Sequence, residues 1–182
     1  MGILKNDIER VLLTKEEISE KVKDLANRIK DEYSGKNPLI LCILKGSLIF
    51  TSDLVRELDF PCTIDFMQVS SYGAGAETTG KLVVKKDMDT DISGREVIIV
   101  EDILDTGVTL SNLLPELRRR GAADVKLCVL LNKPERRTVE IAADYVGFDI
   151  ENEFVIGYGL DYDEKYRNLP YIGILKRSVY EK

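Results

Sequence analysis

The sequence contains no histidine. This absence excludes histidine as a general acid or base and as a metal ligand, two roles in which it is a common residue. Any side chain that exchanges a proton with a substrate must therefore be a carboxylate, a lysine or a tyrosine.

Cysteine is scarce, with three residues, at positions 42, 62 and 128, and no Cys-x-x-Cys pair. Their apolar neighbours indicate reduced thiols in the core of a cytosolic protein, so no disulfide is expected. Apolar runs of membrane-spanning length are also missing, and the opening segment, MGILKNDIER, lacks the apolar centre of a signal peptide. We therefore expect a soluble, cytoplasmic protein that does not contact a membrane.

An excess of positive charge is absent as well, because the formal net charge is −6. An acidic chain of this kind is a poor non-specific nucleic-acid binder, so nucleic acid is not an expected partner. The 182 residues, of which 44% are hydrophobic and 32% charged, fit one globular domain with its own core.

One stretch, VIIVEDILDTGVTL at residues 97 to 110, organises the rest of the chain. Its first four residues form a β-branched run without polar alternation, which predicts a strand covered on both faces of a sheet. Leucines at 110, 113, 114 and 117 then recur with helical spacing. Between them, the turn Thr106, Gly107, Val108, Thr109 presents free backbone N–H groups and the positive end of a helix dipole. The stretch predicts an α/β fold with a phosphate-binding turn.

Three acids stand directly before and within this turn. Glu101 and Asp102 would repel a bound polyphosphate unless they face hydroxyl donors or a divalent cation, and vicinal ribose hydroxyls with Mg²⁺ satisfy both conditions. Asp105, at the mouth of the turn, could exchange a proton with the group that attacks the sugar. The alternative is a solvated loop with a helix cap, which an isolated Asp-Thr-Gly would favour.

Other segments repeat the alternation of apolar strands and amphipathic helices. Thr14 and Glu17 have the spacing of a capping box, which marks the start of a helix that ends at Gly35. The expected elements are a helix over 15–33, a strand over 39–44, a helix over 47–58, a strand over 62–71 with an antiparallel partner over 81–87, a helix over 110–120 and a strand over 125–131.

The central stretch resembles the phosphoribosyl pyrophosphate loop of the type I phosphoribosyltransferases. The resemblance extends to LKGS at 44–47, SSYG at 70–73, LLNKPERR at 130–137 and FVIGYGLDYDEKYRNLPYIG at 154–173. The Lys-Pro and FVIGYGLDY segments are similar to those of the 6-oxopurine branch. This implies an enzyme that transfers the 5-phosphoribosyl group of phosphoribosyl pyrophosphate to N9 of hypoxanthine or guanine, giving IMP or GMP and pyrophosphate, with Mg²⁺ as cofactor.

The resemblance also implies the architecture. We expect a doubly wound, mostly parallel sheet flanked by helices, in a single domain over 1–182. The core would cover about 14–143, and a small cap, or hood, would be built from about 1–13 and 144–182. A homodimer or homotetramer is implied in the same way.

The family's functional positions can be carried over to matching residues. The 5′-phosphate would be bound by Asp105 and the turn 106–109, the ribose and a metal ion by Glu101 and Asp102, and a second metal ion or guanine by Asp161. Pyrophosphate would contact Lys45, Gly46 and Arg167, after a non-proline cis peptide between Leu44 and Lys45. The purine would contact Lys133, Phe154, Val155 and Asp161, and a mobile lid would include Ser70, Ser71, Tyr72 and Gly73. Many family members carry aspartate where this chain has Asn132.

Two alternatives stay open at this point. A regulator with this fold could bind RNA or a protein, and its basic face would come from residues 118–120 or 135–137, which we interpret as partners of a helix dipole and solvated charges. Within the enzyme class, a transferase that prefers xanthine or adenine is the other candidate.

Overall fold

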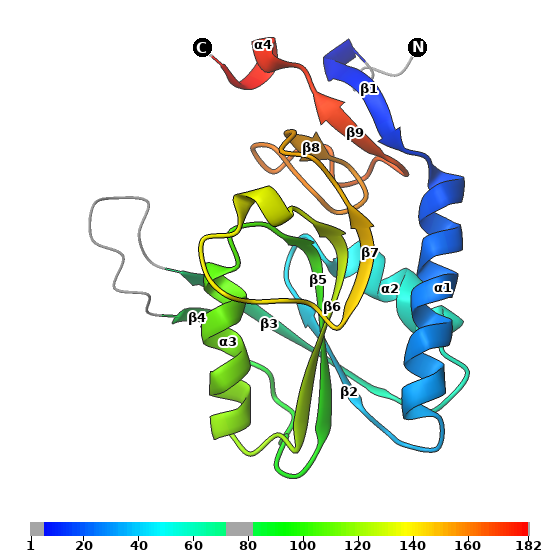
Figure 1. Cartoon of the computed structure of the whole chain (residues 1–182), viewed down its shortest axis with the longest axis vertical. Coiled ribbons are helices and arrows are strands. Elements are labelled where there is room, and N and C mark those ends of the chain that lie inside the picture. Colours follow the sequence, from blue (N-terminus) through cyan, green and yellow to red (C-terminus); the bar gives the residue numbers. More distant parts are fainter. Residues whose placement is uncertain (1–5, 72–81, 182) are drawn as a thin grey trace.

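The computed structural model describes residues 6–71 and 82–181. Six strands form the main sheet in the order β4-β3-β2-β5-β6-β7, and three strands, β1-β9-β8, form a small second sheet above it (Figure 1). The strands are β1 Ile8–Leu13, β2 Leu39–Ile43, β3 Thr63–Ser71, β4 Leu82–Lys86, β5 Glu96–Leu104, β6 Asp124–Asn132, β7 Tyr145–Asp149, β8 Val155–Ile156 and β9 Ile172–Leu175. The helices are α1 Lys15–Tyr33, α2 Leu48–Glu57, α3 Val108–Arg119, the 3-10 turn η2 Pro134–Arg136 and α4 Arg177–Tyr180.

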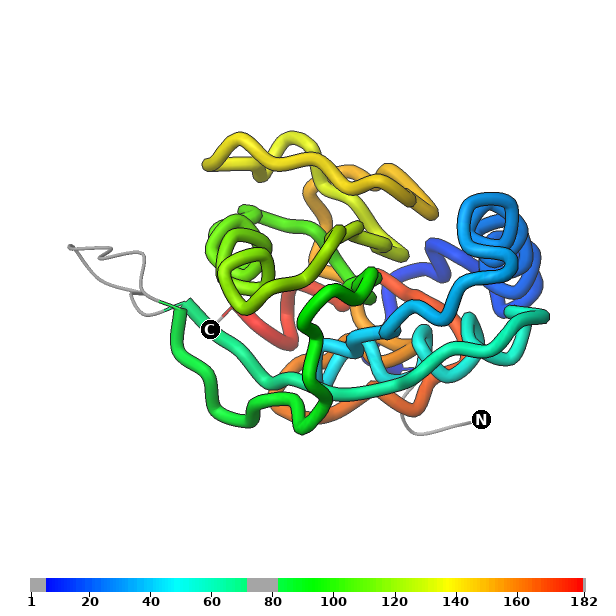
Figure 2. The backbone as a smooth tube through the Cα atoms, turned by 90° about the horizontal axis from the view of Figure 1, so that it is seen from below, coloured from blue at the N-terminus to red at the C-terminus, as the bar shows by residue number. Residues whose placement is uncertain are grey.

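The main sheet is parallel except for β4, which pairs antiparallel with β3. Central β5 is buried on both faces because its side chains alternate between two cores. Ile98 and Val100 pack with α1 and α2, whereas Val97 and Ile99 pack with α3. Figure 2, viewed from below, shows α1 and α3 on opposite sides of the strands. The predicted doubly wound α/β fold is confirmed.

The helix boundaries follow local signals. Both hydrogen bonds of the predicted capping box are present at the start of α1, between Thr14 and Glu17. Gly35 follows the helix with a φ of +83°. Helix α3 begins at Val108, two residues before the predicted start, so part of the predicted turn is its first helical turn.

The C-terminal segment departs from the expected boundary of the hood. Residues 144–149 were expected in the hood, but β7 pairs in parallel with β6 and is the edge strand of the main sheet. Tyr145 is buried in the α1-side core, which fixes the strand there. In the C-terminal segment, the first strand of the small sheet β1-β9-β8 is β8, which starts at Val155. This sheet lies above the end of the main sheet where β5 and β6 finish (Figure 1).

Of the helices in the described part of the chain, none is both long and apolar enough to cross a membrane.

Candidate active site

The turn after β5 forms an anion cradle from the main chain. Gly107 has a φ of +83° and stands at the N-cap of α3, where no side chain caps the helix. The first N–H groups of α3 are therefore available to a ligand, and the dipole of the helix favours an anion there. A cavity of about 100 Å³ lies at this turn and is lined by Glu101, Ile103, Leu104, Asp105, Thr106, Gly107, Thr109 and Leu110. The turn that lines this cavity is the one predicted to bind phosphate, and one continuous segment forms it.

Glu101 and Asp102 lie within β5 rather than after it, because the strand continues to Leu104. Burial, with the neighbouring Asp102 carboxylate, raises the pKa of Glu101 well above its ordinary value. Its Oε2 is buried and has no hydrogen-bond partner among residues 6–71 and 82–181. Burial also raises the pKa of Asp102 to about 6, although the N–H of Ile103 donates to its Oδ1 at 2.8 Å. An unsatisfied, buried oxygen of Glu101 next to the buried carboxyl group of Asp102 favours a hydroxyl donor or a cation as its partner.

A second cavity, of about 450 Å³, lies between the end of β6 and the hood. It is lined by Ile103, Asp105, Lys133, Arg136, Asn152, Glu153, Phe154, Val155, Leu160, Asp161 and Tyr180. Four of the predicted purine-site residues, at 133, 154, 155 and 161, are therefore brought together. The cavity shares Ile103 and Asp105 with the phosphate cradle, so the two sites meet at Asp105.

Lys133 is directed into this protein-lined site and not into solvent. Its residue is only 8% exposed, and its Nζ donates to the carbonyl oxygen of Glu153 at 2.7 Å. Burial is the main cause of a lowered pKa for this ammonium group. Lys133 therefore offers hydrogen-bond donors at the wall of the cavity while it holds the segment that precedes Phe154.

Phe154 supplies an aromatic wall. It is 37% exposed, and its ring stacks with Tyr180 at a centroid distance of 4.8 Å and an interplanar angle of 23°. Tyr162 meets it edge-on at 5.6 Å. Tyr180 was not predicted, because it comes from α4 at the end of the chain and a lone tyrosine there carries no sequence signal.

The predicted pyrophosphate residues lie beside Asp102. The predicted cis peptide is present between Leu44 and Lys45. Gly46 follows, and a β carbon at this position would overlap the carboxylate of Asp102. Arg167 donates to the carbonyl oxygen of Gly159 at 2.8 Å and pairs with Asp161 at 2.9 Å. Its positive charge counteracts the rise in the pKa of Asp102.

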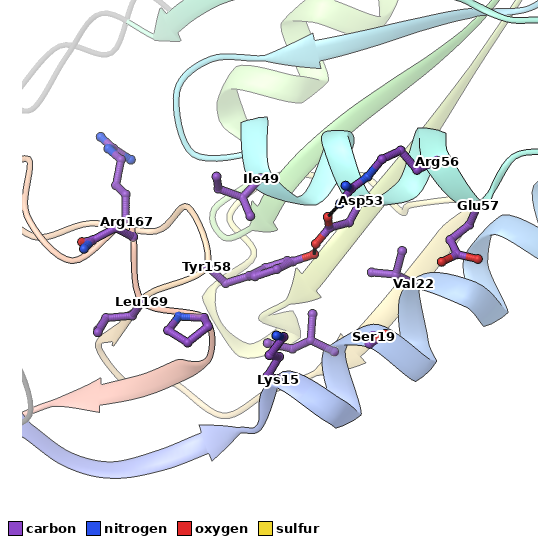
Figure 3. Close-up of a pocket in the computed structure, with 13 residues that line it drawn as sticks. Lys15, Ser19, Val22, Ile49, Asp53, Arg56, Glu57, Tyr158, Arg167 and Leu169 are labelled. Atoms are coloured by element: carbon purple, nitrogen blue, oxygen red, sulfur yellow. Dashed lines mark hydrogen bonds and ion pairs between the residues drawn. The ribbon is translucent and has the colours of Figure 1, made fainter.

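Arg167 is carried by a loop that contacts α2 through Tyr158. The hydroxyl of Tyr158 donates to Asp53 Oδ2 at 2.6 Å, and Figure 3 shows this contact across a cavity of about 550 Å³. Arg167 and Leu169 line the same cavity on the side opposite α1 (Figure 3).

The interpretation of residues 135–137 as solvated charge is wrong for Arg137, which is partly buried, whereas Arg136 is exposed as expected but forms an ion pair. Arg136 Nε donates to Asp105 Oδ1 at 3.1 Å. Arg137 donates to the carbonyl oxygens of Leu104 and Asp105 and to the side chain of Asn132, so it clamps the phosphate turn to β6. The available signal was position: these residues follow β6, whose carboxyl end lies beside that of β5.

Asn132 and the other basic cluster are also accounted for. Asn132 donates to Asp149 Oδ1 at 2.7 Å and accepts from Arg137, so an amide makes both contacts at this position. At the end of α3, Arg119 and Arg120 donate to Glu116, and Arg120 also donates to Asp87. These contacts neutralise much of the basic charge at residues 118–120.

The predicted lid lies only partly within the described residues. Ser70 and Ser71 are the last residues of β3, and Ser71 Oγ accepts from Thr109 Oγ1 at 3.2 Å. Tyr72 and Gly73 lie outside the described residues.

Comparison with known proteins agrees with this architecture. The model of the phosphoribosyl transferase domain family matches residues 11–163. The hypoxanthine-guanine phosphoribosyltransferase of Streptococcus pneumoniae strain R6 is 53% identical over 178 residues, which are 98% of this chain and 99% of that one. The Bacillus subtilis protein of the same name is 49% identical over 179 residues, 98% and 99% of the two chains. A hypoxanthine phosphoribosyltransferase structure from Staphylococcus aureus is 46% identical, has a TM-score of 0.96 and matches 100% of this chain and 98% of its own. The chain belongs to the phosphoribosyltransferase family, in its hypoxanthine-guanine branch.

Proposed function

We propose that this protein transfers the 5-phosphoribosyl group of phosphoribosyl pyrophosphate to N9 of hypoxanthine or guanine. The observation that carries the proposal is the pair of cavities that meet at Asp105 and Ile103. A nucleoside monophosphate has a phosphate at one end, a base at the other and a ribose between them. The cradle at 106–109, the carboxyl groups of Glu101 and Asp102, and the aromatic cavity follow the same order.

The reaction replaces one bond at C1′ with another. As the bond from C1′ to the pyrophosphate oxygen breaks, N9 forms its bond to C1′ and the base releases its N7 proton. Asp105 lies where the cradle and the purine cavity meet, so we assign the proton to its carboxylate. Arg136, paired with this carboxylate, holds it in place.

The purine cavity favours an oxygen at C6 of the base. The ammonium group of Lys133 can donate hydrogen bonds but cannot accept one. It therefore matches the O6 of hypoxanthine, guanine or xanthine and not the amino group of adenine. Phe154 and Val155 would contact the ring face and edge, and Asp161 lies at the rim of the same cavity.

Charge develops on the leaving pyrophosphate, and the ribose gains oxocarbenium character. The turn at Lys45 and Gly46 and the guanidinium of Arg167 would stabilise the leaving group, since preorganised charges are most effective where charge appears during the reaction. The residues of the lid at 70–73 would exclude water from the activated sugar.

Mg²⁺ fits the carboxyl groups present. The orphaned Oε2 of Glu101 beside Asp102 is a hard oxygen ligand of the kind Mg²⁺ binds. Within the described residues no group of three or more acidic or sulfur ligands comes together, so Mg²⁺ would also need oxygens from the substrate. Glu101 and Asp102, with Asp161 at a second position, would hold it, and the bound ion would neutralise charge on the pyrophosphate.

The test is a pyrophosphate-release assay with phosphoribosyl pyrophosphate, Mg²⁺ and hypoxanthine, guanine, xanthine or adenine in turn. We expect turnover with hypoxanthine or guanine and none with adenine. Higher activity with xanthine would change the assigned substrate, and no turnover with any purine would refute the enzyme assignment. Omission of Mg²⁺ in the presence of a chelator should abolish turnover.

A homodimer or homotetramer and a cytoplasmic location also belong to this proposal. The resemblance supports the first, and sedimentation velocity would test it. The reduced state of Cys42, Cys62 and Cys128, all free in this structure, agrees with the second.

A further inference from the structure

One carboxylate joins the two cations that the proposed function assigns to pyrophosphate. Glu164 Oε2 lies 2.8 Å from Lys45 Nζ, and Glu164 Oε1 lies 3.3 Å from Arg167 Nη2. Each oxygen of the carboxylate thus contacts a different cation. The hydrogen bond from Lys45 lowers the pKa of Glu164, so the side chain is charged at neutral pH.

The loop fixes the backbone of Glu164. The N–H of Glu164 donates to Asp161 Oδ2 at 2.9 Å. Its φ is +59°, a left-handed conformation that is unfavourable for a residue with a β carbon and that the surrounding loop must maintain.

The same loop is fixed against the turn that carries Lys45. Gly159 approaches Gly46 so closely that a β carbon on Gly159 would overlap the carbonyl oxygen of Gly46. Tyr158, directly before Gly159, is anchored to Asp53 of α2 (Figure 3). Because both loops are fixed relative to each other, their backbones keep the side chains of Lys45, Glu164 and Arg167 within reach of one another.

We infer that Glu164 occupies the place of the pyrophosphate group in the empty enzyme and competes with it for Lys45 and Arg167. This inference rests on the proposed function of those two residues. Glu164 does not act on the reacting atoms. Its side chain is 64% exposed, so it can leave the cations and turn into solvent when pyrophosphate or phosphoribosyl pyrophosphate binds.

The charges around Lys45 and Arg167 indicate that Glu164 competes with pyrophosphate for these cations and does not help it to bind. In the empty site the two cations, Lys45 and Arg167, are balanced by Asp161 and Glu164. Asp161 pairs with Arg167 alone and can remain there, whereas Glu164 bridges both cations. When Glu164 turns away, Asp161 is the one acid among the described residues that still pairs with these two cations. The return of Glu164 after the reaction would help pyrophosphate to leave.

The test compares Glu164→Gln with Asp163→Asn. Asp163 is the matched control because it is the adjacent acid, also has a positive φ and, in the part of the chain that the structure describes, pairs only with Lys165. Titration calorimetry with inorganic pyrophosphate and Mg²⁺ should show about three- to tenfold tighter binding for Glu164→Gln, the size expected for loss of exposed ion pairs. KM for phosphoribosyl pyrophosphate should fall similarly, KM for hypoxanthine should stay constant, and pyrophosphate should become a stronger product inhibitor. Asp163→Asn should match the wild type throughout.

A double mutant separates competition from a general change in the loop. In a Lys45→Met background one of the two contacts of Glu164 is gone, so adding Glu164→Gln should tighten pyrophosphate binding less than it does in the wild type. An equal gain in both backgrounds, unchanged binding or weaker binding would overturn the inference. Wild-type protein that turns over no purine would refute the proposed function itself, and that result is distinct from these outcomes.

Discussion

The two ends of the site are built in different ways. The proposed phosphate cradle at 106–109 uses main-chain groups of one continuous segment between β5 and α3. The proposed pyrophosphate end uses side chains from two loops more than a hundred residues apart in sequence, at Lys45 and at 159–167. Main-chain N–H groups are fixed by the strand and helix that flank them, whereas opposed side chains need partners from elsewhere. We therefore expect the cradle to be rigid and always available, and the pyrophosphate end to exchange partners during the reaction.

Asp105 lies where the phosphate cradle and the purine cavity meet, and its substitution should have the largest effect on kcat. Asp105→Asn keeps the size of the side chain but removes the proton acceptor, so kcat should fall by about 10² to 10⁴. KM values should change much less, because the cradle and the purine cavity remain. Steady-state kinetics with hypoxanthine would measure both.

Arg136→Gln is the control for that substitution. It removes the ion pair at Asp105 but keeps the carboxylate. Its loss of kcat should be smaller than tenfold, since an exposed ion pair contributes about 0 to 1 kcal/mol. Near-wild-type turnover of Asp105→Asn would remove this carboxylate from the mechanism.

Substitution of Gly46 tests the proposed pyrophosphate end of the site. In Gly46→Ala the new methyl group overlaps the Asp102 carboxylate, so the turn or the strand must shift. A displacement of about 1 Å in positioned groups can cost about 10²-fold, and we expect such a loss in kcat/KM for phosphoribosyl pyrophosphate. Gly147→Ala is the control, because its methyl group would also overlap a neighbour, the carbonyl oxygen of Leu130, but lies in β7, away from the site. It should lower the melting temperature and leave kcat/KM nearly unchanged. An equal loss of kcat/KM in both variants would contradict this difference.

The same division explains what the sequence could predict. The capping box at Thr14 and the strands β2, β3, β4 and β6 depend on neighbours in sequence, and they were predicted close to their observed limits. Strand β5 was also predicted, but it continues to Leu104, beyond the apolar run at 97–100. Strand β7 was assigned to the hood because short aromatic segments follow it, whereas its place depends on pairing with β6. The partners of Glu164 and Phe154 depend on how the hood sits on the sheet. No local pattern encodes a contact between residues 45 and 164 or between 154 and 180.

Substitution of Asp102 tests how much stability the protein loses by burying this carboxyl group in β5. Burial raises its pKa from 3.8 to about 6. The folded protein thus keeps a proton that the unfolded chain releases near pH 4, so the free energy of unfolding falls as pH rises through this interval. Without Mg²⁺, Asp102→Asn should therefore increase the free energy of unfolding by about 2 kcal/mol at pH 7.5 and by much less at pH 4. Urea denaturation at both pH values would measure this difference. As a control, Asp59→Asn, which changes an exposed carboxylate, should show no such pH-dependent gain in the free energy of unfolding. No gain for Asp102→Asn would contradict the prediction and would mean that the protein itself stabilises the charged form of this carboxylate.

Lys133 tests whether the purine cavity is independent of the phosphate cradle. Lys133→Met keeps an unbranched side chain of similar length in a site that is only 8% exposed, but it removes the hydrogen bond to the carbonyl oxygen of Glu153 and the donor to O6. Loss of one charge-assisted hydrogen bond should raise KM for hypoxanthine about tenfold. KM for phosphoribosyl pyrophosphate should stay within about twofold, because the cradle is made by the main chain of residues 106–109 and Lys133 does not line it. A parallel rise in both KM values would mean that the two cavities adjust together through Asp105. In that case the phosphate cradle would not be rigid, and the contrast between a fixed cradle and a pyrophosphate end that exchanges partners would fail.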